Sequence, residues 1–138
     1  VLEYVEGMAE LMAASDLVIC KPGGLTVTEC LCAKAPMILL GRAYGQENIN
    51  VRMLTSLGAA LHVTTARELV GAMGHVDANP AIVEAMLTQG SFLRRPNAAI
   101  DIARNALRLA AAEPSTDARM RKKHFLHFYW GHTPAHIR

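Results

Sequence analysis

The order of strand-like and helix-like segments predicts an α/β fold in which helices cover a doubly wound parallel sheet. Three short apolar runs rich in β-forming residues have the length of buried strands, at residues 16–20, 36–40 and 59–63. Between these runs apolar residues recur at helical spacing, and glycine or proline separates many of the segments. Strands that alternate with helices pair in parallel, because each helix returns the chain to the edge where the next strand starts.

The helices are predicted from apolar spacing and from residues that favour helix ends. Thr65 and Glu68 have the spacing of a capping box, in which side chains satisfy the N–H groups that open a helix. Asn97 is a suitable N-cap residue for the helix at 97–112. Gly58 should end the helix at 46–57. In chain order we expect the end of a strand at 2–5, strands at 16–20, 36–40 and 59–63, and helices at 8–14, 25–34, 46–57, 66–73, 80–89 and 97–112.

Residues 15–29 carry the pattern that is most informative about function. A buried strand precedes Pro22-Gly23-Gly24, and a helix is expected to begin at Leu25. Glycine tolerates positive φ and lets a ligand approach the backbone closely. The first turn of a helix exposes unpaired N–H groups and a partial positive charge, which suits phosphate. Glu29 lies one turn into the helix, where it could accept hydrogen bonds from ribose hydroxyls. The pattern predicts a nucleotide site at the carboxyl edge of the sheet.

The same residues also have a purely structural interpretation. Thr26 and Glu29 are spaced as a capping box, and a glutamate near a helix start is stabilising in any case. Pro-Gly-Gly by itself specifies only a turn. Spacing alone leaves both the nucleotide site and the capped turn open.

A second polar cluster occupies residues 45–50, where a loop runs into the next helix. The side chains of Gln46 and Glu47 at a helix start can reach outward and hydrogen-bond the hydroxyls of a sugar. Polar residues are also ordinary at helix N-termini, so spacing does not decide between the two interpretations. Asn50, one turn further along, is interpreted as structural.

Composition indicates a folded chain of about one domain. Of its 138 residues, 51% are hydrophobic, which is enough for a core, and 19% are charged. No uninterrupted apolar run reaches the length of about 18 residues that a transmembrane helix needs. Cys20, Cys30 and Cys32 are an odd set without disulfide spacing, so we expect reduced thiols in a cytosolic protein rather than a metal site.

Residues 113–138 differ from residues 1–112 and are interpreted as a tail that follows the domain. The tail has five Lys or Arg and two Asp or Glu, a net charge of +3, whereas the rest of the chain has −1. Four of the seven aromatic residues also lie there. Such a segment is typical of contact with anionic lipid. The lack of clear amphipathic periodicity favours a solvated or partly disordered terminus, or a helix that packs on another domain.

The segments SDLVICKPGGLTVTE, AKAPMILL and GQENIN together resemble the C-terminal domain of family 28 glycosyltransferases. That family includes processive diacylglycerol glucosyltransferases, monogalactosyldiacylglycerol synthases and the peptidoglycan glycosyltransferase that acts on lipid I. The Lys-Pro-Gly-Gly turn and the later Gly-Gln-Glu are more similar to the diacylglycerol branch. The resemblance covers about residues 1–110 and implies a Rossmann-like, partial C-terminal domain of a GT-B fold. It also implies that the acceptor-binding N-terminal domain is missing, so we expect a fragment of a longer enzyme.

The resemblance assigns roles to individual residues. The backbone of Val5 would meet the uracil edge, and Met8 would pack near the nucleoside. Glu29 would bind the ribose, while Gln46 and Glu47 would contact the donor hexose. The diphosphate would be surrounded by Gly23, Gly24, Leu25 and Thr26.

The resemblance implies the donor-binding half of a hexosyltransferase that moves a sugar from a UDP-sugar to a lipid such as diacylglycerol. No metal ion or cofactor is expected, because N–H groups at helix N-termini can stabilise the departing diphosphate. The general base is expected in the missing domain, and His62 and His75 are interpreted as structural. Diacylglycerol relatives usually have a proline near Gly-Gln-Glu, where this chain has Arg42-Ala43-Tyr44, so the sugar is left unassigned.

Two other functions stay open. A sugar-nucleotide 2-epimerase with the GT-B fold would share the nucleotide turn, although Lys-Pro-Gly-Gly together with Gly-Gln-Glu argues against it. A non-catalytic fragment that only binds a nucleotide sugar also fits the sequence. We expect a cytoplasmic location, with peripheral membrane contact as a further possibility, and no nucleic-acid partner.

Overall fold

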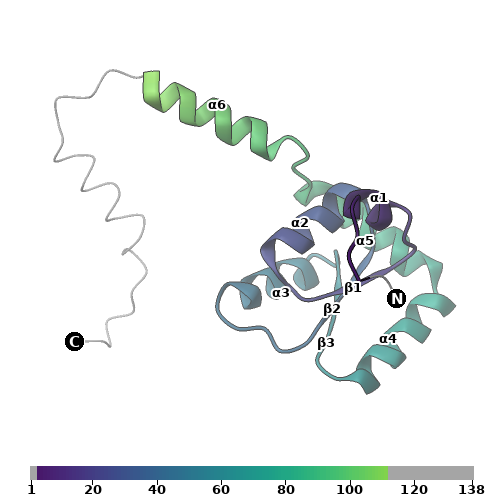
Figure 1. The fold of residues 1–138 in the computed structure, drawn as a ribbon. Coiled ribbons are helices and arrows are strands. Elements are labelled where there is room, and N and C mark those ends of the chain that lie inside the picture. The colour runs from purple at the N-terminus through teal and green to yellow at the C-terminus, as the bar shows by residue number, and fades with distance from the viewer. Residues whose placement is uncertain (1–2, 112–138) are drawn as a thin grey trace, which may run out of the picture. The chain divides into compact units, whose positions relative to one another are not determined.

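A computed structural model describes residues 3–111. Its centre is a parallel sheet in the order β1-β2-β3, formed by β1 (Val18–Cys20), β2 (Met37–Leu40) and β3 (Leu61–Val63) (Figure 1). The predicted α/β fold with a parallel sheet is confirmed. The strand predicted at 2–5 is wrong for the described residues 3–5, because Glu3 lies in a bend and neither Tyr4 nor Val5 belongs to a strand.

The helices alternate with the strands as predicted. In chain order they are α1 (Met8–Ala13), α2 (Gly24–Ala33), α3 (Gln46–Ser56), α4 (Ala66–Ala78), α5 (Pro80–Leu93) and α6 (Ala98–Ala111). Gly58 follows α3 with φ +71°, the left-handed conformation that commonly terminates a helix. Two helices extend beyond their predicted ends. Helix α4 continues past residue 73, through Gly74, to Ala78, and α5 continues past residue 89, through Gly90, to Leu93.

The two faces of the sheet are covered by different helices. Because side chains alternate along a strand, Met37 and Leu39 of β2 point to one face and Ile38 to the other. Met37 and Leu39 share a buried cluster with apolar residues of α2 and α3, such as Leu54. On the other side, α4 packs against β2 and β3. Both faces of the central strand are therefore buried, as a parallel sheet requires.

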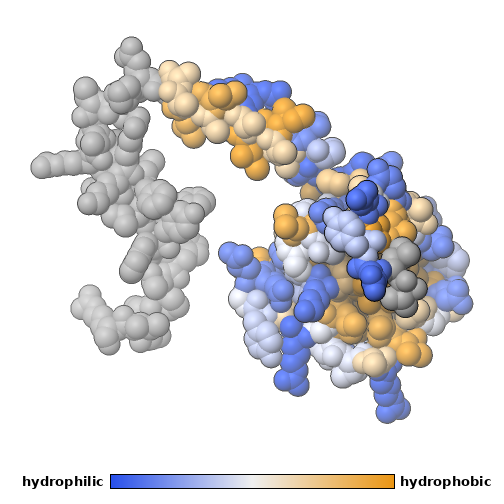
Figure 2. All heavy atoms as spheres, viewed as in Figure 1, coloured by the Kyte–Doolittle hydropathy of each residue, from blue (hydrophilic) through white to orange (hydrophobic). Residues whose placement is uncertain are grey.

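The described residues fall into two compact units, the first ending at Pro96 and the second beginning at Asn97. In the second unit, the backbone carbonyl of Asn97 accepts the N–H of Asp101, so Asn97 stands at the N-cap position as predicted. No side chain of α6 is buried, and its apolar residues are visible in Figure 2. Within residues 3–111, no helix has the length and hydropathy needed to cross a membrane. The predicted tail at 113–138 lies outside the described residues.

Candidate functional site

The carboxyl ends of the three strands lie at one edge of the sheet because the strands are parallel. Each strand leads through a short turn into a helix: β1 into α2, β2 into α3, and β3 into α4. The two polar clusters singled out from the sequence are the first two of these turns. The parallel sheet therefore places both clusters at the same edge, as the nucleotide-site prediction requires.

The turn between β1 and α2 is open at its glycines. Gly23 is the N-cap of α2 in an extended conformation (φ −69°, ψ 140°), and Gly24 is the first helical residue. Neither glycine adopts positive φ. A Cβ atom on Gly23 would meet nothing within 4 Å, and one on Gly24 would lie 4.0 Å from Nδ2 of Asn50. Neither backbone conformation nor packing within residues 3–111 requires glycine here, and the backbone is accessible to a ligand.

The capping box proposed for Thr26 and Glu29 does not form. Helix α2 begins at Gly24, two residues before Thr26, and within the described chain no side chain caps it. Thr26 is half-buried inside the first turn, whereas Glu29 is exposed in the second turn. Leu25, also assigned to the diphosphate, is 81% exposed beside them. The structural explanation for Glu29 is therefore removed, and its carboxylate is available to another partner.

The turn between β2 and α3 contains a glycine of a different kind. Gly45 is the N-cap of α3 with φ 54° and ψ −123°, a combination that L-residues with a side chain rarely adopt. Gln46, exposed, and Glu47, half-buried, follow it in the first turn of α3. As at α2, no side chain from residues 3–111 caps this helix.

Asn50 joins the two turns. Its side-chain amide donates a hydrogen bond to the carbonyl oxygen of Pro22 at 2.9 Å, across 28 positions of sequence. Pro22 is itself fully buried, so the acceptor is held rigidly. The structural role predicted for Asn50 is confirmed, and the Lys-Pro-Gly-Gly turn and the Gly-Gln-Glu turn lie next to each other.

The third turn, between β3 and α4, satisfies its own donors. Oγ1 of Thr65 accepts the N–H of Glu68 at 3.2 Å, and Oε2 of Glu68 accepts the N–H of Thr64 at 2.7 Å and its hydroxyl at 3.0 Å. These hydrogen bonds, first the one from the Thr64 N–H, hold the pKa of Glu68 below its ordinary value. The predicted capping box is confirmed, with Glu68 reaching the residue before the N-cap.

A cavity of about 270 Å³ between α1 and α2 brings two further predicted residues together. Met8 and Glu29 both line it, with Ala9, Met12, Cys32 and Ala33. Val5 is half-buried just before α1 and is not among the lining residues. The cavity thus combines an apolar wall with one carboxylate, beside the C-terminal half of α2.

Comparison with known proteins identifies the family. The model of the glycosyltransferase family 28 C-terminal domain matches residues 1–86, more than half of the chain. The chain belongs to glycosyltransferase family 28. It is 41% identical over 70 residues to a processive diacylglycerol beta-glucosyltransferase of Staphylococcus carnosus, covering 51% of this chain and 18% of that protein.

Two further relatives belong to another branch. A UDP-N-acetylglucosamine–N-acetylmuramyl-(pentapeptide) pyrophosphoryl-undecaprenol N-acetylglucosamine transferase of Azotobacter vinelandii is 31% identical over 105 residues, covering 71% of this chain and 30% of the relative. The crystal structure of Acinetobacter baumannii MurG matches with a TM-score of 0.63 and 24% identity, over 73% of this chain and 31% of that one, and shows the GT-B fold. The family 28 chain spans less than a third of the length of these relatives.

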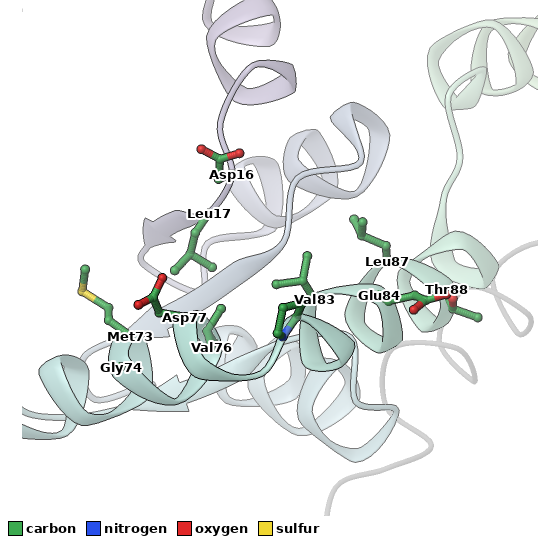
Figure 3. A pocket seen from close by; sticks show the side chains of 11 residues that line it. Asp16, Leu17, Met73, Gly74, Val76, Asp77, Val83, Glu84, Leu87 and Thr88 are labelled. Carbon is green, nitrogen blue, oxygen red and sulfur yellow. The ribbon is translucent and has the colours of Figure 1, made fainter.

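A larger cavity of the family 28 chain lies away from the three turns. It has a volume of about 800 Å³ and opens near the start of β1, between Leu17 and side chains of α4 and α5 (Figure 3). Its lining is mainly apolar, and its charged residues are the acidic Asp16, Asp77 and Glu84. Three carboxylates repel a diphosphate, so this cavity does not compete with the turns for a nucleotide. No local sequence pattern predicts this cavity, because its walls come from segments that are distant in the chain.

The two histidines have structural positions, as predicted. Nε2 of His62 lies 2.8 Å from the carbonyl oxygen of Gly41 and ties β3 to the turn after β2. The carbonyl oxygen of His75, near the end of α4, accepts a hydrogen bond from the side chain of Asn79. Among residues 3–111, no group of three or more metal-ligating side chains lies together.

Proposed function

We propose that this chain is the donor-binding part of a hexosyltransferase that moves a sugar from a UDP-sugar to a lipid acceptor. The printed names of the relatives support the proposal, since one acts on diacylglycerol and another transfers N-acetylglucosamine to an undecaprenol-linked acceptor. A membrane lipid acceptor agrees with a cytoplasmic protein that contacts the membrane peripherally.

The observation that carries the proposal is the pair of uncapped helix N-termini joined by Asn50. Both α2 and α3 begin at a glycine, and their first N–H groups and positive dipole ends lie at the same edge of the sheet. The diphosphate would lie over Gly23 and Gly24, with the exposed Lys21 beside it. N–H donors and helix dipoles stabilise a departing diphosphate without requiring a metal ion.

The remaining parts of the donor fit the surrounding residues. Glu29 and Met8 line one cavity, where the carboxylate can accept hydrogen bonds from ribose hydroxyls and the methionine side chain can pack on the nucleoside. Val5, just before α1, would offer its backbone to the uracil edge. Gln46 and Glu47 in the neighbouring turn would contact the hexose. No cofactor besides the donor substrate is proposed.

Sugar transfer also requires an acceptor hydroxyl and a general base, which we place in the part of the full-length protein outside this chain. The relatives are more than three times as long as the segment they share with it. We therefore expect that the chain incubated with radiolabelled UDP-glucose or UDP-galactose and diacylglycerol yields no glycolipid, because positioning of the acceptor supplies much of the rate. Glycolipid formed at the turnover of a full-length relative would contradict this division of the active site.

The nucleotide site is tested by calorimetric titration of the chain with UDP and with ADP. We expect UDP to bind more tightly, and Gly24→Ala to weaken UDP about tenfold, since a methyl group would displace one phosphate contact. Gly71→Ala is the matched control, because Gly71 is also helical and a Cβ at this α4 position meets nothing within 4 Å. Equal affinity for UDP and ADP would remove the uracil assignment.

Two outcomes separate the alternative functions. A full-length protein that binds UDP-sugar without transferring it would be a binding protein. A full-length protein that converts a UDP-N-acetyl sugar into its 2-epimer would be an epimerase.

Unchanged UDP affinity in Gly24→Ala would place the nucleotide elsewhere.

A further inference from the structure

Helix α6 (Ala98–Ala111) exposes a large apolar surface. None of its side chains is buried. Its four largest apolar side chains are each more than half exposed: Ile100, Ile102, Leu107 and Leu109. Figure 2 shows orange, apolar side chains along much of this helix. An exposed apolar surface is unfavourable in water, and an isolated helix of this length is only marginally stable, so we expect another surface to cover it.

The polar and apolar residues of α6 are separated around the helix more sharply than in α2, α3, α4 or α5. At about 100° per residue, its four polar residues fall within an arc of about 100°: Asp101, Arg104, Asn105 and Arg108. Nη1 of Arg104 lies 3.1 Å from Oδ1 of Asp101, in agreement with their place on one side of the helix. All other residues of α6 are Ala, Ile or Leu. Such a sharp separation at modest overall hydropathy is typical of helices that lie in a membrane surface.

Positive charge gathers in the same part of the chain. Residues 97–138, the unit that contains α6, have seven Lys or Arg and three Asp or Glu, a net charge of +4 with histidine neutral. Residues 1–96 have seven and nine, a net charge of −2. After α6, the sequence of residues 119–130 contains four Lys or Arg, four aromatic residues and no acidic residue. Basic residues are attracted to anionic headgroups, and Trp and Tyr are enriched where a membrane meets water, so this unit complements an anionic bilayer.

The width of the apolar arc favours a bilayer over a single helix of another protein. A helix that packs on one neighbour typically has an apolar stripe of about 100°. In α6 the apolar residues occupy the remaining arc of about 260°, and Ile100 and Ile102 point about 160° apart. One neighbouring helix would leave one of these two side chains uncovered, whereas lipid chains can surround both.

We propose that α6 lies on the surface of an anionic lipid bilayer, with its Ala, Ile and Leu side chains among the lipids and its polar arc toward water. At 14 residues the helix is too short to span a bilayer, so it would lie along the surface. Arg104 is one turn from Ile100 at the border of the apolar arc, where its stem can stay in apolar surroundings while its guanidinium reaches lipid phosphates. The contact would concentrate the protein on the membrane that holds its lipid acceptor, a consequence that rests on the proposed function.

The experiment measures flotation of the full chain with vesicles of phosphatidylglycerol and phosphatidylcholine in equal parts, and with vesicles of phosphatidylcholine alone. We expect flotation with the anionic vesicles and little with the neutral ones. Raising the salt from about 0.1 M to about 1 M should decrease binding strongly, because the screening length falls from about 10 Å to about 3 Å. Equal binding to both kinds of vesicle would overturn the anionic assignment, and no flotation with either would overturn the whole proposal.

A matched pair of α6 variants tests the apolar arc. Ile102→Glu and Asn105→Glu introduce the same charge at exposed positions of one helix, the first in the apolar arc and the second in the polar arc. We expect Ile102→Glu to bind anionic vesicles about tenfold more weakly than Asn105→Glu, since only the former removes an apolar side chain from the lipids. Equal vesicle binding by the two variants would overturn the role of this face.

Two further measurements separate the alternatives. A dimer in light scattering without lipid that Ile102→Glu dissociates, together with a wild-type chain that does not bind vesicles, would show that α6 pairs with a second copy instead. UDP titration distinguishes this proposal from the proposed function, because both variants should bind UDP like the wild type. A chain that binds vesicles but not UDP would refute only the proposed function, and one that binds UDP but not vesicles would refute only the membrane contact.

Discussion

The turn before α2 and the turn before α3 both place a glycine at the N-cap, but the two glycines have different structural roles. Gly45 has φ 54° and ψ −123°, so its backbone excludes a side chain whether or not a ligand is bound. Gly23 is extended, with open space where a Cβ would lie. Gly45 determines the backbone conformation of its turn, whereas Gly23 leaves the space beside its own turn open. The turn before α4, which uses Thr65 and Glu68 instead, shows how the same fold caps a helix with its own side chains.

The largest effect should separate ligand binding from stability at α2. Glu29→Ala is expected to reduce the binding free energy of UDP by about 1.5–3 kcal/mol, which is the contribution expected from hydrogen bonds between ribose hydroxyls and a carboxylate. Its thermal midpoint should change little, because Glu29 is exposed and takes part in no cap. Thr28→Ala, one position earlier and also exposed, is the control for both calorimetry and melting. A large fall in the midpoint with unchanged UDP affinity would restore the structural role.

The second prediction compares the two glycines directly by urea unfolding. Gly45→Ala should lower the free energy of unfolding by about 1–3 kcal/mol, since the alanine must adopt a strained backbone conformation. Gly23→Ala should stay within about 0.5 kcal/mol of the wild type, because its conformation is available to every residue. Equal losses in both variants would mean that the turn before α2 needs glycine for folding after all.

The third prediction concerns the self-capped turn. Thr65→Ala should reduce the free energy of unfolding by about 1 kcal/mol, because it removes the acceptor for the N–H of Glu68. UDP affinity should not change, since this turn is assigned no part of the donor. If UDP affinity fell together with stability, all three turns would have to be treated as one site.

The smallest effect is a pH dependence at the same turn. The pKa of Glu68 is lower in the folded chain than in the unfolded chain, so its stabilising contribution is present above the unfolded value of about 4.3 and is lost as the pH falls through the folded value. Urea midpoints measured from about pH 6 down to about pH 3 should show this component in the wild type. Glu68→Gln should lack it.

Local patterns in the sequence predicted the sheet well, because each strand lies in an apolar run and most of the turns contain glycine or proline. The strand at 2–5 failed where it is described, since Glu3 to Val5 find no neighbouring strand with which to form hydrogen bonds. The helix ends near Gly74 and Gly90 were placed too early. Gly90 is buried, and a Cβ there would lie 3.1 Å from Leu31, so packing against α2 keeps the helix intact through a weak helix former.

The site was predictable to a different degree. The Thr26–Glu29 pattern satisfies the capping-box rule, yet the helix starts at Gly24, so the pattern falls one turn too late. Asn50 could be interpreted as structural, but its acceptor, Pro22, could not be named, because that bond depends on how two distant turns pack. Contacts across elements follow from the register of the sheet, which no local pattern encodes.

The bond from Asn50 to Pro22 also affects how the two turns respond to a ligand. A single amide fixes their separation before anything binds, so a molecule that spans both meets a preorganised surface and loses less conformational entropy than it would between independent loops. The contributions of its two ends are then linked, since one bound end holds the other at its turn without a further loss of translational and rotational freedom. A free hexose touches only one turn and gains none of this cooperativity. The binding free energy of free hexose should therefore be far smaller than the contribution that the hexose makes to the binding free energy of the UDP-sugar.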